Sequence, residues 1–185
     1  MGPSGVAVLP SVLTTGDLPL AELHAARLDG ELFALAAGFC PVDEIEQARH
    51  RAMAVRAGRG ARLIAELGTA AWVWGAADLV PPVLEFCVRL DARSRHAPTP
   101  LMAVREVVLD PDDIVDVGAP VTSPLRTAVD LARFRPVLHP VDADAIRRLA
   151  DVGGFGRADA EALLDRRRNL PAKRRARERL RAVLG

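Results

Sequence analysis

Apolar residues recur at helical spacing two thirds of the way along the chain. Ser123 is typical of a helix N-cap, and Pro124 suits the first helical position, where a missing N–H costs nothing. Leu125, Val129 and Ala132 then fall on one side of the predicted helix. This stretch therefore predicts a firmly capped helix that packs against a core.

Opposite charges lie four residues apart in the same helix. Arg126 and Asp130 are within reach of each other at this spacing, although the order of the charges is the less favourable one. We expect them to pair at the surface. The pair explains both residues structurally and indicates no chemistry.

Shorter patterns predict an α+β fold. Further helices are expected over 19–28, 43–57, 68–75, 141–150, 157–168 and 171–184, and strands over 63–65, 83–90, 102–109 and 114–117. Residues 31–42 predict a hairpin turning near Ala37 and Gly38, which with the helix before it makes half of a winged helix. We divide the chain into a partial winged-helix region (1–42), an α+β domain (43–152) and a basic helical segment (153–185).

Charge is balanced overall but uneven along the chain. Among the 185 residues, Lys+Arg number 25 and Asp+Glu 24, which does not indicate a polyanion-binding protein. Residues 106–116 carry five acids and no base, whereas residues 166–181 carry nine basic residues and only Glu178 as an acid. This asymmetry indicates either a nucleic-acid contact or two charged faces that meet.

Residues with catalytic or metal-binding chemistry are scattered. Cys40 and Cys87 have no ligand at metal-binding spacing and predict buried thiols of a reducing compartment. The acidic run at 110–113 lacks the spacing of a calcium loop and predicts a solvated turn. Structural or surface roles are expected for the histidines, which are His24, His50, His96 and His139. We therefore expect no catalytic residue, no metal and no cofactor.

Two further patterns concern partners and location. Trp72 is expected in the core, and Trp74, about 200° away around a helix, could face a partner. The N-terminus lacks a basic region, and an early proline, Pro10, interrupts its apolar run, so neither a signal peptide nor a transmembrane span is expected. The predicted location is the cytoplasm.

Three segments resemble, in order, the winged-helix antitoxins of the AbiEi type. Residues 20–42 resemble the recognition helix and wing of that family, and Thr-Ala-Ala-Trp-Val-Trp-Gly at 69–75 resembles a helix of its second domain. Residues 117–133 are similar to its hairpin followed by Thr-Ser-Pro-x-Arg-Thr-x-x-Asp-Leu-Ala. The resemblance implies a bacterial repressor or antitoxin whose winged helix binds operator DNA and whose second domain counters a nucleotidyltransferase toxin. It also implies that the C-terminal Vsr-like endonuclease domain of many relatives is absent.

The chain departs from this family in its wing. Relatives carry arginines there, whereas residues 32–38 hold no charge, and little patterned sequence precedes Thr15 for the earlier helices of a winged helix. Because phosphate contacts require cations, the departure weakens the expectation of DNA binding by this element. The hairpin could instead be packed as core.

We expect a non-enzymatic, antitoxin-like transcriptional regulator that binds double-stranded DNA, counters a toxin, or both. The residues expected at DNA are Arg27, Arg174, Arg175, Arg177 and Arg181. A solvated basic face, or pairing with residues 106–116, would also explain the C-terminal arginines. The alternatives are a protein-interaction module that has lost DNA binding and a remnant of a Vsr-like endonuclease-associated protein. No membrane and no small-molecule ligand is predicted as a partner.

Overall fold

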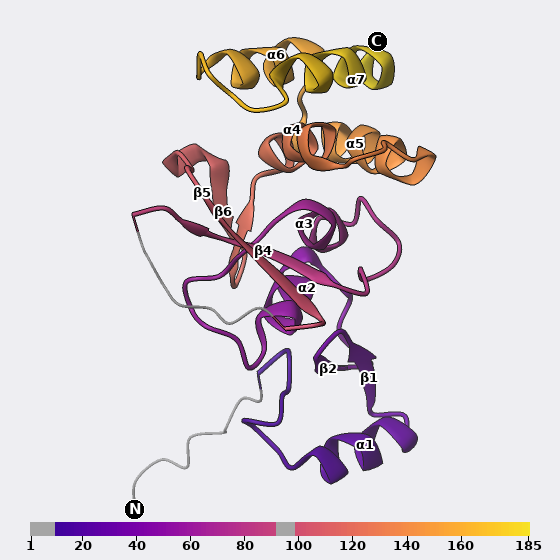
Figure 1. The fold of residues 1–185 in the computed structure, drawn as a ribbon. Coiled ribbons are helices and arrows are strands. Elements are labelled where there is room, and N and C mark those ends of the chain that lie inside the picture. Colours follow the sequence, from indigo (N-terminus) through magenta and orange to yellow (C-terminus); the bar gives the residue numbers. More distant parts are fainter. Residues whose placement is uncertain (1–9, 92–98) are drawn as a thin grey trace, which may run out of the picture.

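The computed structural model describes residues 10–91 and 99–185, so His96 lies outside the described residues. The molecule is layered along one direction (Figure 1). A helix and a hairpin form one end, a sheet with two helices forms the middle, and the last four helices form the other end. The predicted α+β class is confirmed.

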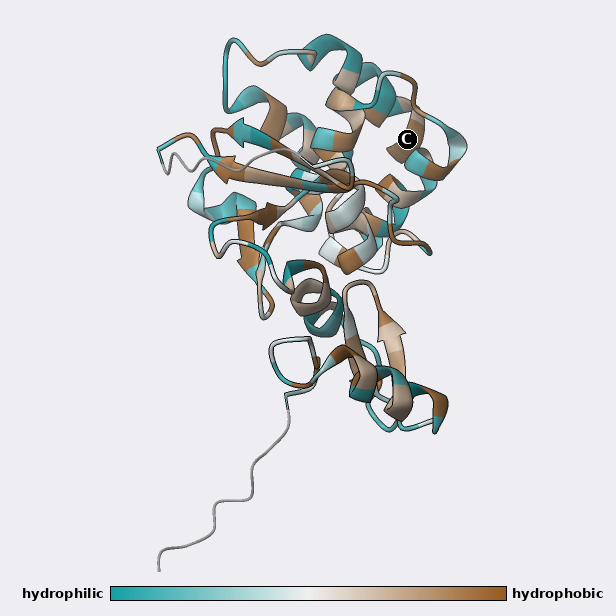
Figure 2. Ribbon diagram, turned by 60° about the horizontal axis from the view of Figure 1, so that its bottom comes forward, coloured by the Kyte–Doolittle hydropathy of each residue, from teal (hydrophilic) through white to brown (hydrophobic). Residues whose placement is uncertain are grey.

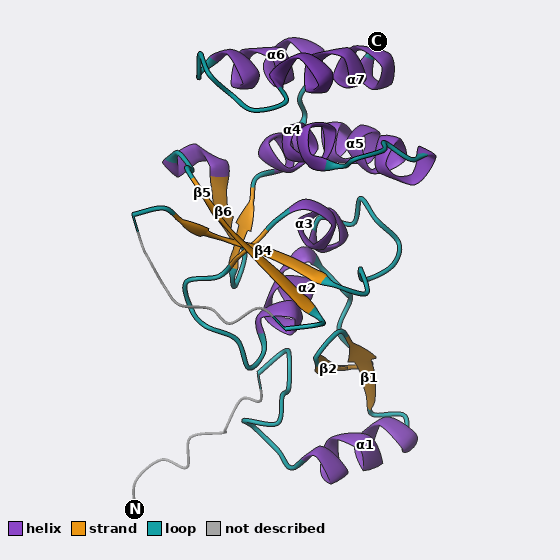
Figure 3. Cartoon of the chain, in the orientation of Figure 1, coloured by secondary structure: helices purple, strands orange, loops and turns teal. Residues whose placement is uncertain are grey.

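Most expected elements occur, within a few residues of their expected bounds (Figure 3). The helices are α1 (Leu20–Leu28), α2 (Ala48–Arg56), α3 (Leu67–Val73), α4 (Pro124–Phe134), α5 (Pro140–Gly153), α6 (Arg157–Asp165) and α7 (Lys173–Leu184). The strands are β1 (Leu32–Leu35), β2 (Gly38–Pro41), β3 (Ile64–Ala65), β4 (Leu84–Arg89), β5 (Met102–Val107), β6 (Ile114–Asp116) and β7 (Pro120–Thr122). A 3₁₀ turn, Pro111–Asp113, precedes β6.

The main sheet is mixed and has the strand order β5-β4-β3-β7-β6. Strand β3 is central because Ala65 lies opposite Phe86 of antiparallel β4 and opposite Val121 of parallel β7. Consecutive side chains of β4 are buried on both faces of the sheet, Phe86 in one apolar cluster and Cys87 in another. This burial explains why residues 86–88 of β4 are continuously apolar instead of alternating with polar residues.

Helix α3 joins the two largest apolar cores. Trp72 packs toward the sheet, as expected, whereas Leu67 and Ala71 pack toward α4. The C-terminal helices complete the second core, because Leu164 of α6 and Leu180 of α7 are buried in it. Residues 153–185 therefore cover α4.

The expected N-cap of α4 is confirmed. The hydroxyl of Ser123 accepts the backbone N–H of Arg126 at 3.3 Å, with Pro124 in the first turn of α4. Gly154 ends α5 in the left-handed conformation, with φ +61°. This conformation favours glycine, and it explains the helix connector at Gly153 and Gly154.

The prediction that a helix begins at residue 43 is wrong, because α2 begins at Ala48. The backbone N–H of Gln47 donates to Nδ1 of His50 at 3.2 Å, which closes the N-terminus of the helix. Nε2 of the same buried imidazole lies 2.8 Å from a carboxylate oxygen of Glu44. Glu44 therefore bends back onto the first turn instead of forming it.

Candidate interaction surface and arginine pocket

Residues 10–42 form a small structure that we call the helix–hairpin unit. Leu13 and Phe39 exchange backbone hydrogen bonds of 2.7 and 2.9 Å, which adds the segment before α1 to the β1–β2 hairpin. Leu23 is the buried residue of α1, and it packs with Leu13, Leu32 and Phe39. Helix α1 is therefore held mainly through Leu23, and most of its surface stays exposed to solvent.

The exposed surface of the unit is acidic and apolar. It carries four acidic residues and one basic residue, which are Asp17, Glu22, Asp29, Glu31 and Arg27. Leu28 is 85% exposed, and Leu20 and Val42 are also exposed. Exposed Ala34, Ala36 and Ala37 make the hairpin neutral at its tip. Figure 2 shows apolar stretches alternating with hydrophilic ones in this unit.

The basic residues that the sequence predicts at DNA do not come together. Arg27 lies on α1 at one end of the molecule, and the four C-terminal arginines lie on α7 at the other (Figure 1). Arg174 is 95% exposed, with Glu178 at 3.8 Å. Arg175, by contrast, donates to the carbonyl oxygen of Arg133 at 2.6 Å. No single face of the molecule therefore presents all five arginines.

Two of the C-terminal arginines pair with α6. Arg177 donates to Asp165 at 2.7 Å, and Arg181 donates to Glu161 at 2.9 Å. Hydrogen bonds from Lys173 and Arg177 hold the pKa of Asp165 below its ordinary value, and the bond from Arg181 does the same for Glu161. Much of the basic charge of α7 is therefore compensated within the molecule.

The Arg126–Asp130 pair forms, but the prediction that it lies at the surface is wrong. Nε of Arg126 donates to Asp130 at 2.8 Å, while its Nη1 donates to Asp113 at 2.7 Å. Arg133 donates to the other oxygen of Asp130 at 2.8 Å. The side chain of Asp130 is only 2% exposed. For Arg126, burial lowers the pKa, but the two carboxylates outweigh burial and raise it overall.

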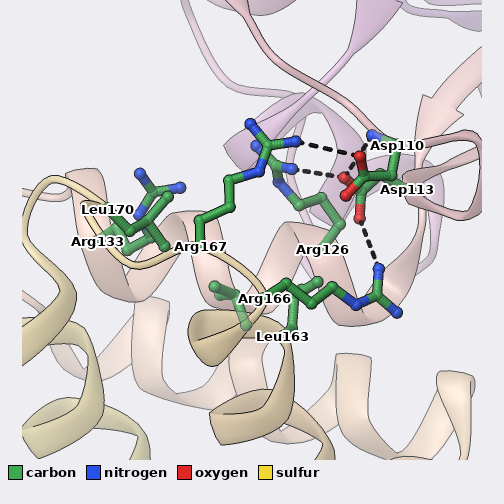
Figure 4. Close-up of a pocket in the computed structure, with 9 residues that line it drawn as sticks. Asp110, Asp113, Arg126, Arg133, Leu163, Arg166, Arg167 and Leu170 are labelled. Carbon is green, nitrogen blue, oxygen red and sulfur yellow. Dashed lines mark hydrogen bonds and ion pairs between the residues drawn. The ribbon is translucent and has the colours of Figure 1, made fainter.

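The acidic run at 110–113 is not the solvated turn that was expected. Asp113 is buried, and its carboxylate accepts both the backbone N–H of Asp110 at 3.0 Å and the guanidinium of Arg126. Arg167 donates to Asp110 at 3.2 Å, and Arg166 lies 3.9 Å from Asp113 (Figure 4). The acidic segment thus meets the start of the basic run, which is one of the two arrangements that the charge asymmetry indicates.

A pocket of about 370 Å³ opens beside this network. Four guanidinium groups line it, from Arg105 of β5, Arg126 and Arg133 of α4 and Arg167 of the α6–α7 connection. The Phe134 ring fixes two of them, since its centroid lies 4.0 Å from the Arg105 guanidinium and 4.4 Å from that of Arg133. We call this site the arginine pocket.

Buried Glu66 holds Arg105 in place. The guanidinium of Arg105 donates to both carboxylate oxygens of Glu66, at 2.7 and 2.5 Å. Burial raises the pKa of Glu66, and Arg105 opposes that effect. This site could not be predicted from the sequence, because its arginines come from a strand, a helix and a connection far apart in the chain. One signal was available in the sequence: apolar residues lie on several sides of α4, which indicates that most of this helix, with its arginines, is buried.

The remaining candidate groups are structural. Cys40 and Cys87 are buried free thiols, as expected, and burial raises the pKa of the Cys40 thiol to about 11. Trp74 is partly buried, and its indole N–H donates to the Thr122 carbonyl at 2.8 Å, so the polar edge of this side chain is occupied. Within residues 10–91 and 99–185, His, Cys, Asp and Glu side chains form no group that could hold a metal ion.

No helix in the described part of the chain combines the length and apolar content needed to cross a bilayer. No family model and no curated protein matches the chain. Among solved structures, it is similar to the crystal structure of the RV2827C protein from Mycobacterium tuberculosis, with 18% sequence identity and a TM-score of 0.47. The match covers 95% of this chain and 76% of that chain. The resemblance to AbiEi-type antitoxins stays a prediction.

Proposed function

We propose that this chain is an antitoxin-like protein-binding module whose helix–hairpin unit contacts a protein instead of duplex DNA. The observation that carries the proposal is the surface of that unit, where α1 is open to solvent and acidic residues outnumber basic ones by four to one. A helix held on one side and exposed on the others is suited to docking against a partner.

Electrostatics argues against duplex DNA as that partner. DNA affinity depends mainly on cations at phosphates, and each contact contributes about 0.9 to the slope of log affinity against log salt. Arg27 could make one such contact, but Asp29 and Glu31, which follow it closely in the chain, are exposed as well. The neutral hairpin tip adds no further cation, so the unit would repel the backbone overall.

The composition of the surface indicates the chemistry of the partner. Leu20, Leu28 and Val42 are apolar and exposed, and they lie among the acidic side chains of the unit. Interfaces between proteins combine apolar anchors with a polar rim. A protein with a basic, partly apolar face would therefore fit, and a toxin encoded by a neighbouring gene is the partner that the antitoxin resemblance suggests.

Co-expression with the product of the adjacent gene tests the proposal. We expect a stable complex by size-exclusion chromatography, and we expect Glu22→Arg combined with Glu31→Arg to abolish it. The matched control is Asp151→Arg combined with Glu178→Arg, which reverses the same number of exposed charges on α5 and α7. A complex that survives the first double variant, or is lost equally in the control, would refute the role of the unit.

A further inference from the structure

We propose that the arginine pocket binds a small phosphate-bearing anion. The site lies between β5, α4 and the α6–α7 connection, and the proposal is independent of the function assigned to the helix–hairpin unit. Its volume of about 370 Å³ falls within the range of small-molecule sites. Guanidinium groups suit phosphate because their planar N–H donors match its oxygens in pairs.

The arginines stand between the buried carboxylates and the pocket. Asp113, Asp130 and Glu66 have side chains no more than 3% exposed, so they add almost nothing to the accessible surface. None of these three lines the pocket, and Glu106 is its one acidic lining residue within the described chain. The carboxylates therefore reduce the net charge of the site, but most of the charged groups that line the pocket are guanidinium groups.

Each lining arginine keeps N–H donors that the protein does not use. Arg126 and Arg133 donate through Nε and Nη1 to protein acceptors. Arg105 donates through Nε and Nη2, and Arg167 through Nη2. A guanidinium carries five N–H donors, so one nitrogen or more of each group remains for a ligand. In the described residues, none of these remaining nitrogens is both fully buried and without a hydrogen-bond partner.

The donors are already ordered. Glu66 and the Phe134 ring hold Arg105, while Asp130 and the carbonyl oxygen of Pro171 hold Arg133. Figure 4, a close-up of an adjoining pocket that shares Arg126, Arg133 and Arg167, shows Arg126 and Arg167 reaching Asp113 and Asp110 from two different elements. Ordering side chains on binding normally reduces affinity, and these contacts remove much of that cost.

Calorimetric titration of the full chain with inorganic pyrophosphate, and separately with inorganic phosphate, tests the proposal. We expect saturable binding that weakens as chloride rises. Arg167→Gln should weaken it about tenfold, because one charge-assisted hydrogen bond is lost. Asp110, the partner of Arg167, is half exposed, so this variant leaves no buried charge unpaired. The control is Arg168→Gln, an exposed neighbour that does not line the pocket.

A second variant protects the test against loss of structure. Arg105→Lys keeps a cation beside Glu66 but removes the planar fork, and we expect weaker pyrophosphate binding with an unchanged far-UV circular dichroism spectrum. Absence of saturable binding to the wild-type protein at millimolar pyrophosphate would overturn the proposal. Equal affinities of the Arg167→Gln and Arg168→Gln proteins would overturn it as well, since binding would then lie elsewhere.

Discussion

At the residue scale, α4 shows how a buried ion pair differs from an exposed one. Asp130 accepts hydrogen bonds from Arg126 and Arg133, and all three side chains are less than a tenth exposed. Such a network is weak evidence for stability, because desolvation opposes the attraction between the charges. Removing one member is different, since it leaves buried charge that is no longer fully compensated.

We therefore expect Asp130→Ala to lower the free energy of unfolding by about 3–5 kcal/mol, because Arg133 loses its carboxylate and Arg126 loses one of its two. The matched control is Asp144→Ala, which removes an exposed carboxylate paired with Arg147 three residues on, at 3.0 Å. This change should cost less than about 1 kcal/mol. Urea denaturation measures both values, and similar losses in the two variants would contradict the buried network.

The cysteines give a second prediction at this scale. Cys40 and Cys87 are fully buried, and burial raises the pKa of both thiols, so little thiolate is present at neutral pH. Neither should react with a thiol reagent in the native protein, and both should react in urea. An added exposed thiol, Ala103→Cys, should react at once and serves as the control. Rapid labelling of the native wild-type protein would contradict their burial.

At the element scale, α7 is attached to the molecule through its arginines as well as its apolar face. Arg179 donates to the carbonyl oxygens of Ala132, Arg135 and Pro136, at 3.0, 2.7 and 2.9 Å. These carbonyls belong to the last turn of α4 and the residues after it, where helical partners run out. The basic run at residues 166–181, which in the sequence indicates a nucleic-acid contact, thus contains an arginine that caps another helix.

Arg179→Ala should lower the free energy of unfolding by about 1–3 kcal/mol, because it removes charged hydrogen bonds to the end of α4. Arg174→Ala is the control on the same helix, and its exposed side chain should contribute little. Thermal denaturation followed by circular dichroism compares the two variants. A larger loss for Arg174→Ala would show that the capping contacts are not the important ones.

The contact between α6 and α7 predicts a pH dependence. The folded protein holds the pKa values of Asp165 and Glu161 below their ordinary values. Each group therefore stabilises the folded state above its unfolded pKa, which is about 4, and loses that effect as pH falls through the lowered folded pKa. Asp165→Asn should reduce the acid-induced loss of stability, measured by urea midpoints at successive pH values. Asp151→Asn, an exposed change on α5, should not, and an unaltered profile in Asp165→Asn would contradict the pairing.

At the scale of the whole molecule, local patterns predicted the elements but not their neighbours. Caps, glycines and apolar spacing located α4, α5 and the hairpin because those signals act within a few residues. Strand order and the arginine pocket depend on contacts between distant segments. The sequence places Arg126 at the surface for this reason, since its buried partner Asp113 is 13 residues earlier in the chain.

The same limit applies to charge. The uneven distribution indicates either a nucleic-acid contact or two charged faces that meet, and the sequence favours the nucleic-acid contact of these two, since the C-terminal arginines are expected at DNA. In the folded chain, Arg167 meets Asp110, and Arg177 meets Asp165. The helix–hairpin unit instead carries a local acidic excess, where four acids accompany Arg27.

The central claim is that this unit does not bind the phosphate backbone, and fluorescence anisotropy with a labelled DNA duplex at low salt tests it most directly. We expect the wild-type chain to show no saturation at micromolar concentrations, and Glu22→Arg combined with Glu31→Arg to gain salt-sensitive binding, because the change adds cations to the exposed helix. Micromolar binding by the wild-type protein that Arg27→Gln abolishes would contradict the claim.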